Sequence, residues 1–324
     1  MGNITFIKDF VISGFPGLQP RYYGIVSAAL FFVYVCTLMG NAVFITLFVL
    51  SKSLQKPVYY CIVNLAVCDV LFSTTALPKI ISRYWFEDGS VSFLGCFLQM
   101  FFVHYFGAVT ARLLSVMAID RYAAICFPLR YHSIMTDRNV FILIFGCWIV
   151  GLIGPLMMVI RAYPLPYCAG NTIVHCYCDH IAIIALACTT REDYVQPTFI
   201  NVMIVLLGSL AIIVFSYCAI IVAVLRISSA QGRLKTFSTC SPQLIIIALF
   251  FLPRCLYYAS FYLNVVFNIN IKFSADVQVV IIVLYSLLPP MINPFIYCLR
   301  TEEVKKILLT KLQRTKIGVK LRRP

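Results

Sequence analysis

The sequence predicts an all-α membrane protein, a bundle of seven transmembrane helices followed by a short cytoplasmic amphipathic helix 8. Three observations predict this fold class. Of the 324 residues, 61% are hydrophobic and only 12% are charged, about half the charge of a typical water-soluble domain. The chain also contains seven apolar stretches of about 20 residues or more, long enough to cross a bilayer. Finally, Lys and Arg are distributed unevenly over the connections between these stretches.

Each stretch is identified by its length and by its scarcity of charge. Four of the seven contain no Asp, Glu, Lys or Arg at all, and the second, third and sixth retain only a few. In chain order the stretches are 25–50, 57–81, 97–122, 140–160, 197–225, 236–262 and 277–299. We therefore expect an N-terminal arm over 1–24, a receptor-like bundle over 25–299 and a basic amphipathic tail with helix 8 over 300–324.

The basic residues predict the orientation of the bundle. Of the 26 Lys and Arg residues, 17 lie on the side that carries the tail and seven on the opposite side. Because cytoplasmic connections carry the excess of basic residues, we expect an extracellular N-terminus and a cytoplasmic tail. The net charge of +14 then reflects topology and contact with lipid headgroups, and no nucleic-acid partner is expected.

Two features agree with this orientation. Asn3 begins an Asn-Ile-Thr glycosylation sequon in the arm that we expect outside. Five cysteines also fall on the expected outer side, where disulfides form. They are Cys96, Cys168, Cys176, Cys178 and Cys188. Because five is odd, at least one of them should stay unpaired within the chain.

Four polar side chains from four stretches converge in the inner half of the expected bundle: Asn41, Asp69, Thr110 and Asn293. One interpretation is that each merely satisfies a neighbour and holds the helices together. The other is a switching role or a sodium site, because polar groups in hydrocarbon are costly and usually functional. No cluster of His and acidic residues suggests any other metal or a cofactor.

Arg254 and His104 lie in the outer half of the expected bundle, each about 12 Å from the outer ends of their stretches. No acidic residue of the stretches lies at the same depth as Arg254. A buried cation needs water, carbonyls or an anion, so a hydrated outer cavity that takes an anionic ligand is one interpretation. The other is that Arg254 snorkels or bonds backbone carbonyls freed by Pro253. Tyr258, one turn further on, shares its helix face.

Three segments resemble vertebrate olfactory receptors, a branch of the rhodopsin-like G-protein-coupled receptors. They are 117–131 (MAIDRYAAICFPLRY), 235–242 (KTFSTCSP) and 290–300 (PMINPFIYCLR). The resemblance spans about residues 10–300, and the loop around Cys176 is most similar to fish or amphibian members. Two departures stand out. Thr110 occupies a position where many members carry an acid, and Pro253 is closer to non-olfactory relatives.

The resemblance implies disulfides from Cys96 to Cys178 and from Cys168 to Cys188, which leaves Cys176 unpaired. It implies a G-protein-coupling switch, in which Arg121 is held near Asp120 at rest and Tyr217 and Tyr297 swing toward it on activation. The expected coupling and switch residues are Asp120, Arg121, Tyr122, Tyr217, Asn293, Pro294 and Tyr297. The expected odorant pocket comprises His104, Gly107, Ala108, His180, Asn201, Phe251, Arg254, Cys255, Tyr258 and Tyr262.

The implied function is detection of an odorant, anionic if Arg254 faces it. The implied partner is a stimulatory, olfactory-type G protein that raises cyclic AMP, and the implied location is the plasma membrane of olfactory cilia. An enzyme is not expected, because no stretch holds the residues of an acid–base or metal site. A channel or transporter would show repeats or charged pore residues. The remaining alternative is a non-olfactory receptor of the same superfamily for a hormone, lipid or peptide.

Overall fold

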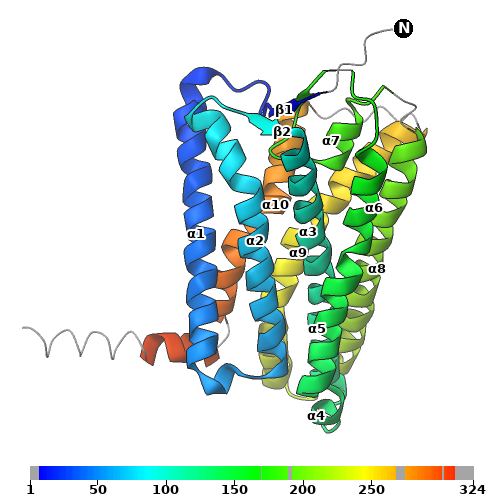
Figure 1. The fold of residues 1–324 in the computed structure, drawn as a ribbon. Coiled ribbons are helices and arrows are strands. Elements are labelled where there is room, and N and C mark those ends of the chain that lie inside the picture. The colour runs from blue at the N-terminus through cyan, green and yellow to red at the C-terminus, as the bar shows by residue number, and fades with distance from the viewer. Residues whose placement is uncertain (1–6, 169, 189–191, 268–273, 301–302, 311–324) are drawn as a thin grey trace, which may run out of the picture.

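Long helices running side by side make up the body of the molecule (Figure 1). The computed structural model describes residues 7–168, 170–188, 192–267, 274–300 and 303–310. In chain order the helices are α1 Tyr23–Leu50, α2 Pro57–Trp85, α3 Phe93–Cys126, α4 Tyr131–Ile134, α5 Asp137–Gly151, α6 Ile153–Ala162, α7 His180–Ile184, α8 Glu192–Leu225, α9 Ala230–Phe267 and α10 Ala275–Arg300. Short 3-10 turns, Pro20–Tyr22 and Lys52–Leu54, precede α1 and α2, and residues 303–310 form one more helix.

Seven helical spans in the described part are long and apolar enough to cross a membrane. Their outward faces carry large apolar side chains. Phe32, Phe145 and Phe215, on three different spans, are 65%, 68% and 68% exposed. Apolar surface of this extent is normally buried in a water-soluble protein, and helices of this kind satisfy their own backbone groups in hydrocarbon. The molecule is therefore a multi-pass membrane protein, as the sequence predicts.

Each predicted stretch overlaps one span, but several helices extend beyond it. The helix α3 begins at Phe93 rather than at residue 97, because the Ser92 hydroxyl caps it by accepting a hydrogen bond from the Gly95 N–H at 3.2 Å. The helix α9 runs over 230–267, against a predicted 236–262. Hydropathy detects only the part of a helix that lies in lipid, so polar turns at its ends are missed.

The fourth span is the one that departs from a single continuous helix. It is divided at Leu152 into α5 and α6. Pro155 lies in the first turn of α6 and has no N–H to donate to the carbonyl of Gly151. A proline removes one bond of the helical ladder and clashes with the preceding turn, which explains why the span breaks here.

The two ends of the bundle differ. The disulfide end carries the Cys96–Cys178 bond, and the tail end carries residues 303–310 (Figure 1). At the disulfide end lies a small sheet in the order β2-β1-β3, built from β1 Asp9–Ile12, β2 Ser90–Ser92 and β3 Thr172–Ile173. The strand β1 pairs antiparallel with β2 and parallel with β3. Part of the expected N-terminal arm is thus fixed to the bundle.

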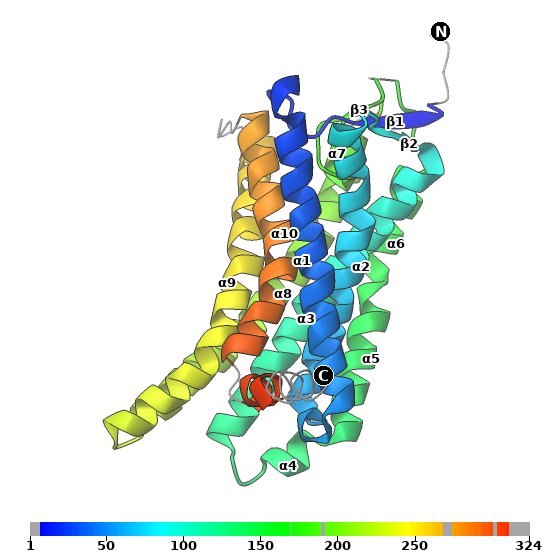
Figure 2. The same ribbon diagram turned by 90° about the vertical axis from the view of Figure 1, so that its left-hand side faces the viewer.

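The helix α3 runs through the centre and packs against α2, α5, α6 and α8, whereas α9 packs mainly against α10. The tail-end half of α9 diverges from the rest of the bundle (Figure 2). Residues 303–310 lie across the tail end and are fixed to α2 through Glu303 (Figure 1). Its carboxylate accepts a hydrogen bond from the Tyr59 hydroxyl at 2.8 Å and another from the Lys56 ammonium.

Candidate functional site

A cavity opens in the half of the bundle nearest the disulfide end, with about 710 Å³ of empty space that is partly open to the outside. Its walls come from α2, α3, α5, α6, α8, α9 and α10, and from the connection between β3 and α7. The charged or strongly polar residues in these walls are His104, Arg112, Asp179, Asn201, Arg254, Tyr177, Tyr258 and Tyr285. Concave, largely apolar sites with a few polar groups are the usual form of small-molecule sites.

One face of α3 forms the central wall. The lining residues His104, Gly107, Ala108, Ala111 and Arg112 recur at steps of three and four, which places them on a single helix face. Small side chains in the middle of this face create the space. A Cβ atom added at Gly107 would meet no atom within 4 Å.

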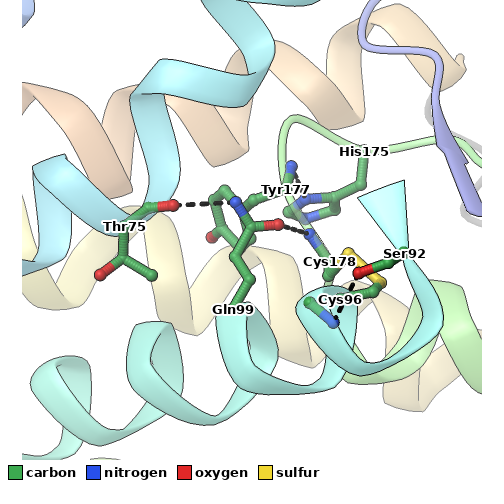
Figure 3. Close-up of a disulfide and its surroundings, with 8 residues drawn as sticks. Thr75, Ser92, Cys96, Gln99, His175, Tyr177 and Cys178 are labelled. Carbon is green, nitrogen blue, oxygen red and sulfur yellow. Dashed lines mark hydrogen bonds between the residues drawn. A yellow bond between two sulfur atoms is a disulfide. The ribbon is translucent and has the colours of Figure 1, made fainter. Parts of the chain in front are cut away.

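The Cys96–Cys178 disulfide fixes the roof of the cavity (Figure 3). It joins the first turn of α3 to the connection before α7, and Gln99 adds two hydrogen bonds. The Gln99 side chain accepts from the Cys178 N–H at 2.9 Å and donates to the Thr75 carbonyl at 2.8 Å. Tyr177 and Asp179, which flank Cys178, are thereby held where they line the cavity.

A second disulfide, Cys168–Cys188, joins the segment before β3 to the segment after α7. Cys176 is not disulfide-bonded and is buried. Burial raises the pKa of the Cys176 thiol to about 12. It therefore stays protonated at neutral pH and is a poor nucleophile.

Asp179 and His104 form a close pair at the roof. The His104 Nε2 lies 3.4 Å from one Asp179 oxygen, while its Nδ1 lies 2.9 Å from the Met100 carbonyl. Both partners are acceptors, and a neutral imidazole has only one N–H. The ring thus presents one nitrogen to each of two acceptors.

The other oxygen of Asp179 accepts from the Ile181 N–H at 3.0 Å and caps α7. Burial raises the pKa of the Asp179 carboxyl. The hydrogen bond from His104 and the nearby imidazoles of His175 and His180 outweigh this effect and hold the pKa below its usual value. The carboxylate is thus ionised, and each of its oxygens already has one partner.

Arg254 lies on the opposite side of the cavity without a carboxylate partner at ion-pair distance among the described residues. Its Nη1 donates to the Phe250 carbonyl at 3.2 Å. The guanidinium carbon lies 3.7 Å from the Phe250 ring centre and 4.8 Å from that of Tyr285. Cation–π contacts of this kind stabilise a positive charge without cancelling it.

Arg112 adds a second guanidinium to the cavity from α3, where its Nη1 donates to the Ala108 carbonyl at 2.9 Å. The sequence prediction did not include it. The signal was available, because Arg112 lies eight residues, about two turns, beyond His104 on the same helix. The cavity walls therefore contain two arginines and a single acid, which is paired with His104.

The predicted pocket residues are placed as follows. Six of them line the cavity: His104, Gly107, Ala108, Asn201, Arg254 and Tyr258. Phe251 does not line this cavity, because it is only 1% exposed and packs in the core. The lining residue is its neighbour Phe250. One residue along a helix is a rotation of about 100°, and the sequence did not resolve that rotation.

Three further predicted residues lie elsewhere. Cys255 packs against the core instead of lining the cavity. His180 lines a smaller neighbouring cavity, where its Nε2 lies 3.3 Å from the Thr198 hydroxyl. The side chain of Tyr262 lies outside the described residues, as does Asn3.

The sequence also missed the wall formed by α5 and α6. Its lining residues Gly151, Gly154, Pro155 and Met158 carry little polarity, so only their small size could have marked them. A Cβ atom at Gly154 would come within 2.9 Å of the Asn201 side chain. Glycine at this position therefore lets Asn201 of α8 approach α6.

A third cavity, also smaller than the first, lies around the predicted polar core. Asp69, Thr110 and Asn293 line it, and the Asn293 Nδ2 donates to Asp69 at 2.8 Å. Asn41 does not line it. Its Nδ2 donates to the carbonyls of Thr37 and Pro290, at 2.8 Å and 3.1 Å. Asn41 thus joins α1 to α10, as the helix-holding interpretation expects.

The predicted coupling residues gather in the tail-end half. Arg121 Nε lies 3.8 Å from Asp120, which also accepts a hydrogen bond from the Tyr131 hydroxyl at 2.8 Å. Tyr217 and Tyr297 are buried, and their hydroxyls have no hydrogen-bond partner in the part of the chain that is described. An unpaired buried hydroxyl is costly, so both are suited to an alternative arrangement in which they find partners.

The remaining two coupling residues pack against aromatic or small groups. The Tyr122 ring lies against those of Phe127 and Phe215. Pro294 approaches Gly40 so closely that a Cβ atom at that glycine would lie 2.7 Å from the proline ring. Glycine is therefore required where α1 meets α10.

The chain matches a family described as olfactory receptor over residues 30–315. It is 34% identical to human (Homo sapiens) olfactory receptor 6N1 over 98% of each chain. It is 35% identical to human olfactory receptor 10G7, over 95% of this chain and 96% of that one. Among solved structures, the crystal structure of squid rhodopsin superposes with a TM-score of 0.74 at 20% identity, covering 89% of this chain and 80% of that one.

Proposed function

Because the chain belongs to the olfactory receptor family of rhodopsin-like G-protein-coupled receptors, we propose that it binds a small odorant in the cavity beneath the Cys96–Cys178 bond. Binding there activates a stimulatory, olfactory-type G protein at the tail end and raises cyclic AMP. The observation that carries the proposal is the charge of Arg254 in the wall of this cavity. No carboxylate lies at ion-pair distance from it among the described residues.

The charges of the cavity favour an anionic odorant. The acid in its wall, Asp179, is engaged by His104 and by the cap of α7. An amine ligand would have to share this carboxylate with both partners. Arg254 and Arg112 use only part of their donors on backbone carbonyls, and a guanidinium has five N–H groups that match a carboxylate. A carboxylate, sulfate or phosphate group is therefore the best complement.

The signalling surface of the proposal is the tail end. Asp120, Arg121, Tyr217 and Tyr297 gather there, within the half where α9 diverges from the bundle (Figure 2). The excess of basic residues on this side supports a cytoplasmic tail end and an extracellular disulfide end. We propose this orientation for a receptor in the plasma membrane of olfactory cilia, with Asn3 as a glycosylation site.

The test is a panel of carboxylate, neutral and amine odorants applied to cells that report cyclic AMP. We expect a carboxylate among the active compounds. Arg254→Gln should then cost about 2–5 kcal/mol of its binding free energy, because a desolvated charge pair is lost. The matched control is Arg21→Gln, an exposed arginine at the same end. Equal potency of the carboxylate on both variants would remove Arg254 from the binding site.

A further inference from the structure

The outer cavity and the smaller cavity around Asp69 share part of their walls. Five residues line both of them: Phe72, Gly107, Phe250, Arg254 and Tyr285. These residues therefore form a partition between the odorant cavity and the polar core. Arg254 is the one charged residue in this partition.

The cavity around Asp69 contains one acidic and one basic side chain among its described lining residues. Asp69 is its one acidic residue, and Arg254 is its one basic residue among the described lining. Asp69 is only 3% exposed. A buried carboxylate needs a compensating charge, because the loss of hydration costs several kcal/mol. The Asn293 amide supplies one hydrogen bond to Asp69 but no charge.

A second observation shows that this cavity still requires a donor or a cation. The Oδ1 of Asn293 is buried and has no hydrogen-bond partner in the described structure. Thr110 and Ser286 contribute hydroxyls, and the Ser286 hydroxyl is already donated to the Ile282 carbonyl. Oxygen atoms from Asp69 and Asn293 thus face a space whose natural occupant is positively charged.

We propose that the guanidinium of Arg254 supplies the compensating positive charge for Asp69 across this cavity and makes the polar core independent of sodium. Arg254 lines the same small cavity as Asp69, and no ion pair joins the two at their present positions in the described structure. Two aromatic rings, Phe250 and Tyr285, hold the guanidinium between the cavities. From there it can turn its free N–H groups toward Asp69 and Asn293. The arrangement differs from a cation site in which a metal ion neutralises the acid.

The experiment measures thermal unfolding of the purified receptor in sodium chloride and in choline chloride at the same ionic strength. The wild-type melting temperature should be the same in both salts. Arg254→Gln should melt about 2–4 °C higher in sodium than in choline, because sodium then binds the vacated site and stabilises the folded state. The double variant Arg254→Gln with Asp69→Asn should again show no difference, because the anionic ligand of sodium is gone.

The charge-retaining variant Arg254→Lys is the matched control and should remain insensitive to sodium. Where Arg254→Gln does not fold, Arg254→Met keeps the length and apolar stem of the side chain and takes its place. A wild-type receptor that sodium stabilises relative to choline would overturn the proposal, and so would a neutral Arg254 variant that is indifferent to sodium. Neither outcome depends on the odorant, so the proposed function is tested separately.

Discussion

A side chain at Gly107 should change the stability of the fold little but should fill part of the cavity. A Cβ atom there meets nothing within 4 Å, and the residue lines both cavities. We expect Gly107→Leu to reach the cell surface normally but to respond to odorant with at least about tenfold lower potency, a loss of about 1.4 kcal/mol. The cyclic AMP dose response at matched surface expression measures this.

The control for this substitution is Gly208→Leu. Gly208 lies on the exposed face of α8 and also has no atom within 4 Å of its added Cβ. It should leave the potency unchanged. Full potency of Gly107→Leu would show that the odorant binds elsewhere.

The buried histidines of the roof predict a pH dependence. Burial and the charge of His104 lower the pKa of His180 to about 3, and burial also lowers that of His175. Both fall below the unfolded value of about 6.5. The folded state therefore resists protonation, and its stability is complete above about pH 6.5 and declines as the pH falls toward about 3. At about pH 5.5 His180 should cost about 1.4 kcal/mol.

Melting temperatures of the purified receptor between neutral and mildly acidic pH check this dependence. His180→Gln should reduce the slope with pH, because a neutral amide replaces the imidazole. His132→Gln is the control, since His132 is exposed near the tail end. If the two variants show the same slope as the wild type, His180 does not govern acid sensitivity.

The strand β1 anchors the N-terminal arm through one large side chain. Phe10 is fully buried and packs against the rings of Phe93, Phe97 and Tyr167. We expect Phe10→Ala to destabilise the receptor by about 3–5 kcal/mol, the usual cost of removing a buried phenylalanine. Val11→Ala, in the same strand but only half-buried, should cost much less. Surface labelling of cells and melting of purified protein would show the difference.

The elements were predictable to different degrees from the sequence. The seven spans were accessible because lipid imposes long apolar stretches on the chain. The strands β1, β2 and β3, of four, three and two residues, are too short for alternation to be recognised. The division at Leu152 was missed because apolarity continues across the break, although Pro155 marks it. Helix ends such as Ala230 lie outside the apolar region, where hydropathy gives no signal.

The site was partly predictable for a related reason. The family resemblance placed His104, Gly107 and Ala108 in the expected pocket, and all three line the cavity on one face of α3, because residues three and four apart share a face. It did not distinguish Phe250 from Phe251, since both lie in one uniformly apolar segment. Asp179 was missed because the Cys96–Cys178 bond, and not local sequence, brings that connection over the cavity. Loop residues acquire a place in a site only through such long-range constraints.

In the proposed function, the receptor as a whole connects an odorant cavity near one end to a signalling surface near the other. Arg121 is the cation at that surface which contacts Asp120, and its side chain is 25% exposed. We expect Arg121→Ala to abolish odorant-evoked cyclic AMP, because it removes the guanidinium that we propose leaves Asp120 to meet the G protein.

Binding in the outer cavity should survive this change, since Arg121 lies at the far end of α3 from His104. Thermal stabilisation of the purified variant by an active carboxylate should therefore equal that of the wild type. Arg138→Ala is the matched control, because Arg138 is exposed at the start of α5 in the same tail-end half, and it should signal normally. An Arg121→Ala receptor that raises cyclic AMP to wild-type levels at equal surface expression would separate Arg121 from coupling. Loss of both signalling and ligand stabilisation would instead indicate damage to the fold.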